Sequence, residues 1–202
     1  MAEAVAPRYR AMVILAAGSG LRQGECFGLT VDRVDFLRRT VTVDRQVVVH
    51  AGSPPHLAPP KTKASYRTVP VPQVVLDALA AHLAAYTSGL EGLVFTNDKG
   101  EAIRRTSFGE MWRKAAKVAG LPVGTGMHDL RHTYASLLIR KGLSVKVVQA
   151  RLGHATAAET LDTYGHLWPD DEDRTREAVE DALSGLGQPR QPAAGSRSQS
   201  TA

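Results

Sequence analysis

The stretch MHDLRHTYASLLIRKG, residues 127–142, decides the expected fold and starts the search for a function. It places His128, Arg131 and His132 within five positions at the beginning of a segment with helical spacing, and Gly142 ends that segment. In a helix, residues three apart point about 60° from each other, so His128 and Arg131 are able to face one target. The segment therefore predicts an amphipathic helix with polar functional groups in its first turn.

The apolar residues of the same segment predict the face that packs on the core. His128 and Arg131 border this face, whereas His132 points away from it. The guanidinium of an arginine keeps its proton and holds phosphate oxygens with two parallel hydrogen bonds. A histidine titrates near neutral pH, so it can bind a phosphate oxygen or move a proton. The pair thus favours an anion as its target. The predicted core face consists of Leu130, Tyr134, Leu137 and Leu138.

A metal ion is the alternative target of these histidines. His128 and His132, four positions apart, would share a zinc ion with His154 or His166 as the third ligand. The glutamate that acts as general base in an HExxH zinc site is absent, because DLR stands between the two histidines, and this arginine would repel a dication. The sequence therefore predicts neither a metal site nor a cofactor.

The composition is that of one globular domain without a membrane span. The chain has 202 residues, a net charge of +5 and a single cysteine, Cys26, which fits a reducing compartment. Its longest apolar run, residues 11–17, is far shorter than the roughly 20 residues that a transmembrane helix needs. We find no signal peptide and expect a cytoplasmic protein. Residues 170–181 are strongly acidic, so the remainder is more basic than the total suggests, as in proteins that bind nucleic acid.

The pattern along the chain predicts a mainly helical α+β fold with a small antiparallel sheet of two or three strands at one edge. β-branched residues favour strands at 40–49 and 61–71, on either side of a proline-rich loop, and a third short strand is expected at 93–95. Ser107 and Glu110 have the spacing of a helix-capping box. Helices are expected at 8–17, 22–29, 73–86, 107–119, 128–141, 144–152, 156–168 and 170–186.

The last residues differ in composition from the rest of the chain. Residues 188–202 are rich in Pro, Ser and Gln, and we expect a disordered tail there. The predicted domain therefore comprises residues 1–187.

Motifs on either side of the opening stretch match those of a known family. GSGLRQGE lies at 18–25, KTKASYR at 61–67, and LGH at 152–154, ten residues before Tyr164. With HDLRH between them, this set resembles the catalytic domain of the tyrosine recombinases, the phage-integrase family, over about residues 8–186. Members of that family typically carry an arginine in a GLRxGE-like turn and a lysine on a β-hairpin. HxLRH, LGH and a tyrosine follow in that order.

The resemblance implies an enzyme that breaks and rejoins DNA strands, with a role for each matching residue. Tyr164 would be the nucleophile that forms a 3′-phosphotyrosyl intermediate, and His128 would be the proton acceptor. A phenol has a pKa of about 10, so cationic neighbours are needed to favour its anion and to stabilise the charge that builds on the phosphate. These neighbours, which make a metal ion unnecessary, would be Arg22, Arg131 and His154.

The lysine that protonates the leaving 5′-oxygen has two candidates. The KTxxSxR pattern of the family matches Lys61, and Lys63 would point the same way on a strand; we favour Lys61. Glu25, which follows the first arginine, is expected to orient a neighbour, although a plain helix carboxylate would look the same. His132 matches a family histidine that looks structural, so it stays outside the predicted active set.

The resemblance also implies partners. These are double-stranded DNA with attachment sites and, as a further partner, an accessory directionality factor. Family members assemble as tetramers on two duplexes and exchange a C-terminal segment between protomers. The helix at 170–186 is the candidate for that segment, with folding back on its own domain as the alternative. We expect a monomer in solution and a homotetramer on DNA.

The chain begins close to its first catalytic helix, whereas family members usually carry an N-terminal core-binding domain, often after an arm-type domain. We therefore expect this domain to be absent, which removes phosphate contacts and makes DNA binding weak at moderate salt. The alternative to a site-specific recombinase is thus a catalytically silent DNA-binding remnant. A type IB topoisomerase-like activity would share the chemistry, whereas a metal-dependent phosphodiesterase would not.

Overall fold

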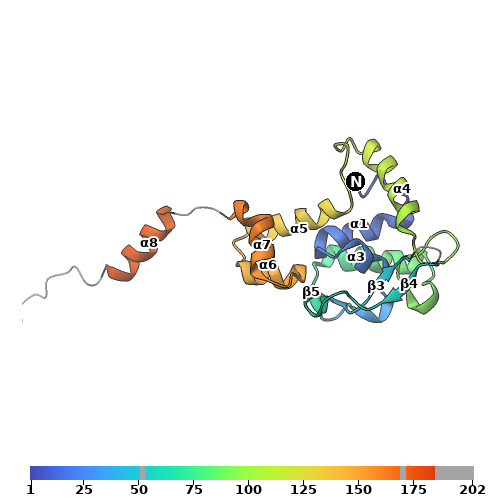
Figure 1. Cartoon of the computed structure of the whole chain (residues 1–202), viewed down its shortest axis with the longest axis horizontal. Coiled ribbons are helices and arrows are strands. Elements are labelled where there is room, and N and C mark those ends of the chain that lie inside the picture. Colours follow the sequence, from blue (N-terminus) through green and yellow to red (C-terminus); the bar gives the residue numbers. More distant parts are fainter. Residues whose placement is uncertain (51–52, 169–171, 185–202) are drawn as a thin grey trace, which may run out of the picture. The chain divides into compact units, whose positions relative to one another are not determined.

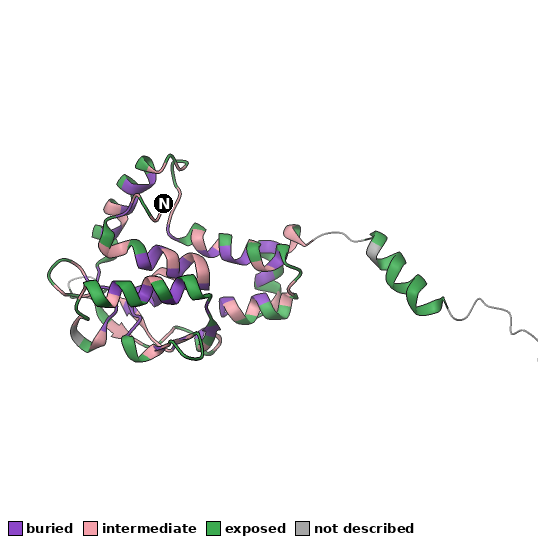
Figure 2. Ribbon diagram, turned by 180° about the vertical axis from the view of Figure 1, so that it is seen from behind, coloured by how far each residue is buried: buried purple, intermediate pink, exposed green. Residues whose placement is uncertain are grey.

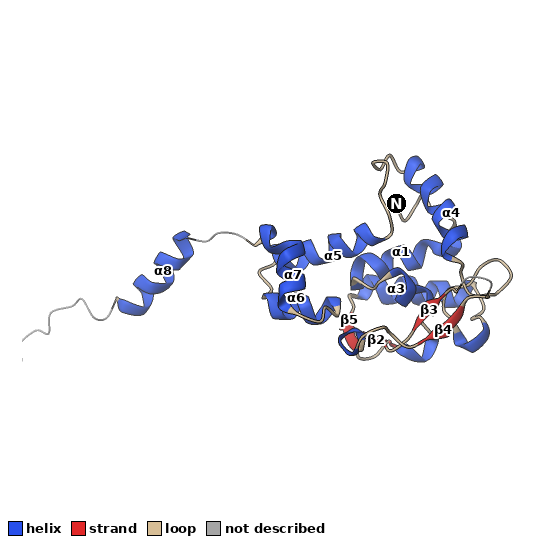
Figure 3. Cartoon of the chain, viewed as in Figure 1, coloured by secondary structure: helices blue, strands red, loops and turns tan. Residues whose placement is uncertain are grey.

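The structure is a computed structural model that describes residues 1–50, 53–168 and 172–184. It divides into two compact units, Met1–Trp168 and Pro169–Ala202. The first unit is mainly helical, with short antiparallel strands along one edge (Figures 1 and 3). This arrangement confirms the predicted α+β fold.

The second unit contains helix α8 (Glu172–Leu183), which lies inside the predicted helix at 170–186. Two acidic residues stand in the first turn of α8, where they interact favourably with the helix dipole. The predicted domain boundary after residue 187 and the predicted tail at 188–202 lie outside the described residues. Among the described helices of either unit, none is long and apolar enough to cross a membrane.

Helix α1 forms the centre of the first unit, because it packs against both α3 and α5 (Figure 1). A proline occupies its first position, where the missing N–H would have no helical partner in any case. Met12 and Leu15 of α1 are completely buried. Helix α3 is buried on one face and exposed on the other (Figure 2). The bounds are α1 (Pro7–Ser19), α3 (Gln73–Ala85) and α5 (His128–Arg140).

Helix α1 extends past the predicted end at residue 17: of the two glycines expected to stop it, Gly18 lies inside the helix and Gly20 ends it. Gly18 lies against α3, and a Cβ at this position would come within 2.4 Å of Val75 Cγ2. The helix ends at Gly20, whose φ of 65° is left-handed and whose N–H donates to the carbonyl oxygen of Ala16. The first glycine thus allows close packing of two helices, and the second allows the chain to leave the helix.

The strands form two small antiparallel sheets in the described residues instead of one. The first has the order β1-β2-β5, and the second pairs β3 with β4. The single strand predicted at 40–49 is wrong, because it is interrupted at Asp44, whose carboxylate accepts hydrogen bonds from Arg33 and Arg45. The two halves therefore join different sheets. The bounds are β1 (Val34–Asp35), β2 (Thr40–Val43), β3 (Gln46–Val48), β4 (His56–Ala58) and β5 (Arg67–Pro70).

The other two predicted strands are shorter or absent. The second begins only at Arg67, because Lys63–Ser65 form a 3₁₀ turn in front of it. In place of the third, predicted at 93–95, Leu93 makes an isolated bridge with Thr30. Short runs of β-branched residues thus overestimate the strand content of this chain.

The remaining helices of the first unit begin at side-chain caps in two cases. The Oγ of Ser144 accepts the N–H of Val147 at 3.4 Å, and the Oγ1 of Thr156 accepts that of Glu159 at 3.2 Å. The capping box predicted at residue 107 is wrong, because α4 begins two residues earlier without a side-chain cap. The bounds are α2 (Gln23–Phe27), α4 (Arg105–Val118), α6 (Val145–Leu152) and α7 (Ala157–Tyr164).

Two apolar clusters hold the first unit together (Figure 2). The larger surrounds α1 and includes Trp112, whose Nε1 donates to the carbonyl oxygen of Thr125 at 2.9 Å. The smaller joins α5, α6 and α7. Two expectations for α5 are wrong: Leu137 is 48% exposed, and Arg131 is buried instead of bordering the core. The smaller cluster consists of Tyr134, Ala135, Ile139, Val148, Leu152 and Tyr164.

Replacing Gly18 by alanine should lower the free energy of unfolding by about 1–3 kcal/mol, because the added methyl group overlaps Val75. Gly109→Ala is the matched control, since Gly109 lies inside α4 and its added Cβ would meet only the flexible end of Arg113, at 3.7 Å. This variant should gain about 0.5–1 kcal/mol from helix propensity. Denaturant unfolding measures both, and equal gains would contradict the packing role of Gly18.

Candidate active site

A groove with a volume of about 1620 Å³ opens on the first unit between α2, β3 and α4. Most charged side chains on its walls are basic, so the groove suits a polyanion. In the part of the chain that the structure describes, no three His, Cys, Asp or Glu side chains gather as a metal site requires. The basic residues of the groove are Arg22, Lys61, Arg105, Arg113 and Lys117.

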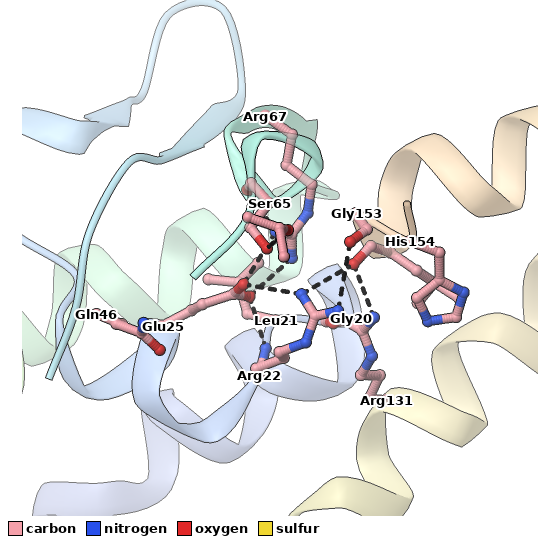
Figure 4. A network of polar contacts seen from close by, with 12 residues as sticks. Gly20, Leu21, Arg22, Glu25, Gln46, Ser65, Arg67, Arg131, Gly153 and His154 are labelled. Atoms are coloured by element: carbon pink, nitrogen blue, oxygen red, sulfur yellow. Dashed lines mark hydrogen bonds and ion pairs between the residues drawn. The ribbon is translucent and has the colours of Figure 1, made fainter. Parts of the chain in front are cut away.

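Two arginines from distant parts of the sequence meet at the C-terminal end of α6 (Figure 4). Arg131 donates from Nη2 to the carbonyl oxygen of Leu152 at 2.7 Å, and Arg22 donates from Nη1 to the same oxygen at 3.5 Å. Arg131 also donates to Gly20 O at 2.7 Å, and Arg22 to Gly153 O at 3.3 Å. The last carbonyls of a helix have no helical partner and carry partial negative charge, so they attract cations.

Arg131 is 2% exposed, an unusual state for an arginine. Burial lowers its pKa to about 10, and the positive charge of Arg22 acts in the same direction. A group with this pKa remains protonated at neutral pH. The structure thus holds a buried cation whose charge is balanced by backbone carbonyls and by Glu25 nearby.

Glu25 lies in the first turn of α2 and contacts two arginines (Figure 4). Its carboxylate accepts the backbone N–H of Arg22 at 2.8 Å and its Nη1 at 3.2 Å. It also accepts Nη1 and Nη2 of Arg67, at 3.0 and 2.7 Å. Burial alone would raise the pKa of Glu25, but the hydrogen bonds and charges of Arg67 and Arg22 hold it below its ordinary value. Glu25 is therefore ionised and buried between two cations.

His154 follows α6 and lies beside the same network. Its Nδ1 is 3.0 Å from Thr160 Oγ1, and its ring is nearly parallel to that of Tyr164, with centroids 6.5 Å apart. Burial lowers the pKa of His154 to about 4, and the charge of Arg131 adds to the effect. The imidazole is therefore neutral at neutral pH.

Tyr164 ends α7 and is 4% exposed. Its hydroxyl is 2.8 Å from Nδ1 of His132, the histidine that the sequence leaves outside the active set. His128 is exposed on the groove, and its ring centroid is 4.6 Å from that of His132. The four-residue spacing of the two histidines on one helix is the signal that relates His132 to His128 and thus to the site.

The two candidate lysines do not lie on a strand, contrary to the prediction that kept Lys63 as the alternative to Lys61. Lys61 lies in the loop after β4 and lines the groove. Lys63 begins the 3₁₀ turn, is exposed, and is absent from the described groove walls. Arg67 is the buried residue of this site to which the sequence gives no role, although it completes the KTxxSxR pattern.

The chain belongs to the phage integrase family, whose model matches residues 2–170. It is 31% identical over 194 residues to a "Tyrosine recombinase XerC-like" protein of Caldanaerobacter subterraneus subsp. tengcongensis, covering 86% of this chain and 49% of that protein. It is 33% identical over 156 residues to the "Putative prophage phiRv2 integrase" of Mycobacterium tuberculosis, covering 76% of this chain and 41% of the relative. The chain thus spans half or less of the length of these relatives.

Solved structures of recombinases share this fold. The Tn1549 transposon integrase in complex with a circular intermediate DNA superposes with a TM-score of 0.74 at 23% identity, covering 86% of this chain and 58% of that one. The catalytic domain of bacteriophage HP1 integrase gives a TM-score of 0.56 at 24% identity, covering 89% of this chain and 85% of that one. The described fold is therefore that of tyrosine recombinase catalytic domains.

Tyr164 should ionise only above pH about 10, because burial raises its pKa and the charge of Arg131 offsets this only in part. The measurement is a spectrophotometric titration of the phenolate band, with the curve of Tyr164→Phe subtracted from that of the wild type. Circular dichroism over the same pH range controls for unfolding. A difference signal that develops near neutral pH would contradict the buried, protonated state of the hydroxyl.

Proposed function

We propose that this chain acts as the catalytic domain of a site-specific DNA recombinase, cutting and rejoining strands through a 3′-phosphotyrosyl intermediate. The observation that carries the proposal is the meeting of Arg22 and Arg131 at the carbonyl oxygen of Leu152. His154 follows two residues later, and Tyr164 stacks beside it. Two guanidiniums and an imidazole near one helix end, with a phenol beside the imidazole, suit a phosphodiester.

The two arginines would hold the scissile phosphate. A guanidinium has five N–H groups, and Arg131 uses two of its own in hydrogen bonds to carbonyls. Arg22, which lines the groove, would turn its remaining N–H groups to the nonbridging oxygens, and Arg131, which is 2% exposed, would reach them with those of its N–H groups that the carbonyls do not use. There they would stabilise the charge that develops in the transition state. The neutral ring of His154 adds a further hydrogen bond. The two arginines would supply the electrostatic stabilisation that a metal ion supplies in other phosphoryl-transfer enzymes.

In the cleavage step, the Tyr164 oxygen attacks the phosphorus while the bond to the 5′-oxygen breaks. The phenol proton leaves toward Nδ1 of His132 at 2.8 Å, which requires the tautomer with this nitrogen unprotonated. His128, the proposed proton acceptor, is next in line, with its ring 4.6 Å from that of His132. Lys61, in the groove, would protonate the leaving oxygen. The new phosphotyrosyl bond keeps the energy for rejoining to another 5′-hydroxyl.

The proposed partner is double-stranded DNA, which the basic groove would bind through its phosphates. The structural relative from Tn1549 was solved in complex with DNA, which supports this choice. We further propose a cytoplasmic monomer that forms a homotetramer on attachment sites, with an accessory directionality factor as an additional partner. Helix α8 would be the exchanged segment. Its exposed apolar residues include Ala178, Val179, Ala182 and Leu183.

A second candidate function is DNA binding without cleavage. The observation in its favour is the state of Tyr164, whose hydroxyl is buried against His132 and is absent from the described walls of the groove. Cleavage requires Tyr164 to reach the phosphate, whereas binding does not. A covalent adduct with DNA separates the two functions.

Incubation with supercoiled plasmid in EDTA, followed by an SDS quench, should trap protein covalently bound to DNA. The adduct should be absent in Tyr164→Phe, because only the phenol oxygen can form the phosphotyrosyl bond. Tyr86→Phe is the matched control. Tyr86 follows α3 and its ring lies under Arg8, so loss of its hydroxyl should leave the adduct unchanged. Denaturing gels of labelled DNA measure the yield.

Each other outcome of this experiment has a defined meaning. DNA binding in a gel shift without any adduct would support the silent DNA-binding remnant. Cleavage that disappears in EDTA would point to a metal-dependent phosphodiesterase instead. Relaxation of the plasmid with an intact adduct would indicate a topoisomerase-like product of the same chemistry.

The rate of adduct formation should be level around neutral pH and should fall in acid. Burial, the neighbouring His132 and Arg131 lower the pKa of His128, so its neutral, proton-accepting form is complete at neutral pH and is lost only as the pH falls through this depressed value, below about 6.5. Single-turnover rates measured over a pH series should show this decline. If the His128→Gln variant shows the same decline in acid, a group other than His128 is the proton acceptor.

A further inference from the structure

One buried arginine, Arg67, has no role in the reaction described above. It begins β5, and its side chain is 6% exposed and absent from the described walls of the groove. Its Nε and two Nη groups make four hydrogen bonds, to Glu25, Ser65 and Arg151. Since a guanidinium has five N–H groups, almost its whole donor capacity is used inside the protein. Arg67 therefore has little left with which to bind a ligand.

The first partner of Arg67 connects it to Arg22 (Figure 4). Two parallel bonds of 3.0 and 2.7 Å join its guanidinium to the carboxylate of Glu25, both side chains being almost fully buried. The same carboxylate accepts the backbone and side-chain N–H groups of Arg22. Arg22 is 35% exposed, and its own bonds to carbonyls are long, at 3.3 and 3.5 Å. Glu25, which Arg67 holds in place, therefore fixes the backbone of Arg22 at 2.8 Å and supports its guanidinium at 3.2 Å.

The second partner of Arg67 is the end of α6. Its Nε donates to the carbonyl oxygen of Arg151 at 2.9 Å, and the next two carbonyls accept from Arg131 and Arg22. Three successive carbonyl oxygens at one helix end therefore receive three arginines. Because this end leads directly into His154, its position also sets that of the imidazole.

Gly153 provides independent evidence that the chain passes close to Arg67 at this point. Its φ is 66°, and a Cβ there would lie 2.9 Å from Nη1 of Arg67 and 3.0 Å from the carbonyl oxygen of Ala64. A residue with a side chain would push the guanidinium away from α6. The glycine of the LGH motif thus lets Arg67 reach under the turn that carries His154.

We propose that Arg67 is a positioning residue of the active site, which fixes Glu25 and the end of α6 so that Arg22 and His154 face the same phosphate. The inference rests on the proposed function, since it concerns the geometry of that reaction. Arg67 does not touch DNA and acts only through its two partners. Arginine is required because a lysine has a single ammonium group, which cannot span a carboxylate and two separate carbonyls with fixed geometry.

A purely structural ion pair is the alternative. If Arg67 serves only stability, its replacement by lysine, which cannot make all four hydrogen bonds, should lower the melting temperature and leave the rate of the folded protein unchanged. Positioning makes a different prediction, because displacement of a catalytic group by about 1 Å costs about a hundredfold in rate. The two roles therefore differ in whether the cleavage rate of the folded Arg67→Lys protein falls.

The test compares Arg67→Lys with the wild type in single-turnover formation of the covalent adduct on a nicked duplex. We expect the rate of the folded protein to fall about a hundredfold. DNA affinity should stay close to that of the wild type, and the melting temperature should be lower, because lysine leaves buried acceptors unpaired. Arg33→Lys is the control for the loss of an arginine ion pair elsewhere: Arg33 donates to Asp44 at 2.7 Å in a more exposed pair, away from the described groove walls. Its rate should equal that of the wild type.

A substrate with a methylphosphonate at the scissile position distinguishes the positioning role from a structural one, because a structural role would affect the rate equally on both substrates. This group lacks the negative charge that Arg22 stabilises, so correct placement of Arg22 matters less. The ratio of the wild-type rate to the Arg67→Lys rate should therefore be about tenfold smaller on this substrate than on the phosphate substrate. If Arg67→Lys does not fold, Glu25→Gln, which keeps the side-chain volume, should show the same pattern and takes its place.

The possible results separate the inference from the proposed function. A folded Arg67→Lys with the wild-type rate overturns the inference alone, as does an equal deficit on both substrates. A wild-type chain that binds both substrates and forms an adduct with neither overturns the proposed function, and the positioning role falls with it. A selective deficit on the phosphate, with Arg33→Lys unaffected, supports both.

Discussion

The arrangement of the first unit depends on the attraction between arginine side chains and the free carbonyls at the end of α6. A helix terminates with oxygens that need hydrogen-bond donors from elsewhere. Here the donors come from Arg22, Arg67 and Arg131, which belong to three remote segments. Meeting this local need brings α5, the start of α2 and β5 to one place. The same contact therefore serves the packing of the chain and the concentration of positive charge.

Concentrating cations in a buried place is costly, and the structure offsets this cost with more than one kind of partner. Carbonyl dipoles neutralise part of the charge, and the ionised Glu25 neutralises another part. Because the cations are held before any ligand arrives, a bound phosphate would meet donors that are already oriented. Preorganisation of this kind is the main source of electrostatic catalysis.

Much of this fold could be predicted from the sequence. The features that could not be predicted depend on tertiary contacts. The glycine at 142 and the cap at Ser144 act locally, so the helices around them were predicted correctly. The strand at 40–49 failed because salt bridges with Arg33 and Arg45 at Asp44 override β propensity. The motifs brought together the arginines, His154 and Tyr164. They missed the His132 contact and the burial of Arg67, since both depend on how separate elements pack.

The resting position of Tyr164 has a consequence for how such a chain would encounter DNA. Proteins of this kind meet vast lengths of duplex for every correct sequence, and they bind it mainly through phosphates that are the same everywhere. A reactive hydroxyl exposed to each of these contacts would leave breaks along the way. Under the proposed mechanism, a Tyr164 that is 4% exposed, with its hydroxyl at His132, would make DNA binding and strand cleavage separate events. The accuracy of cleavage would then depend on the interaction that moves the Tyr164 side chain out of this position.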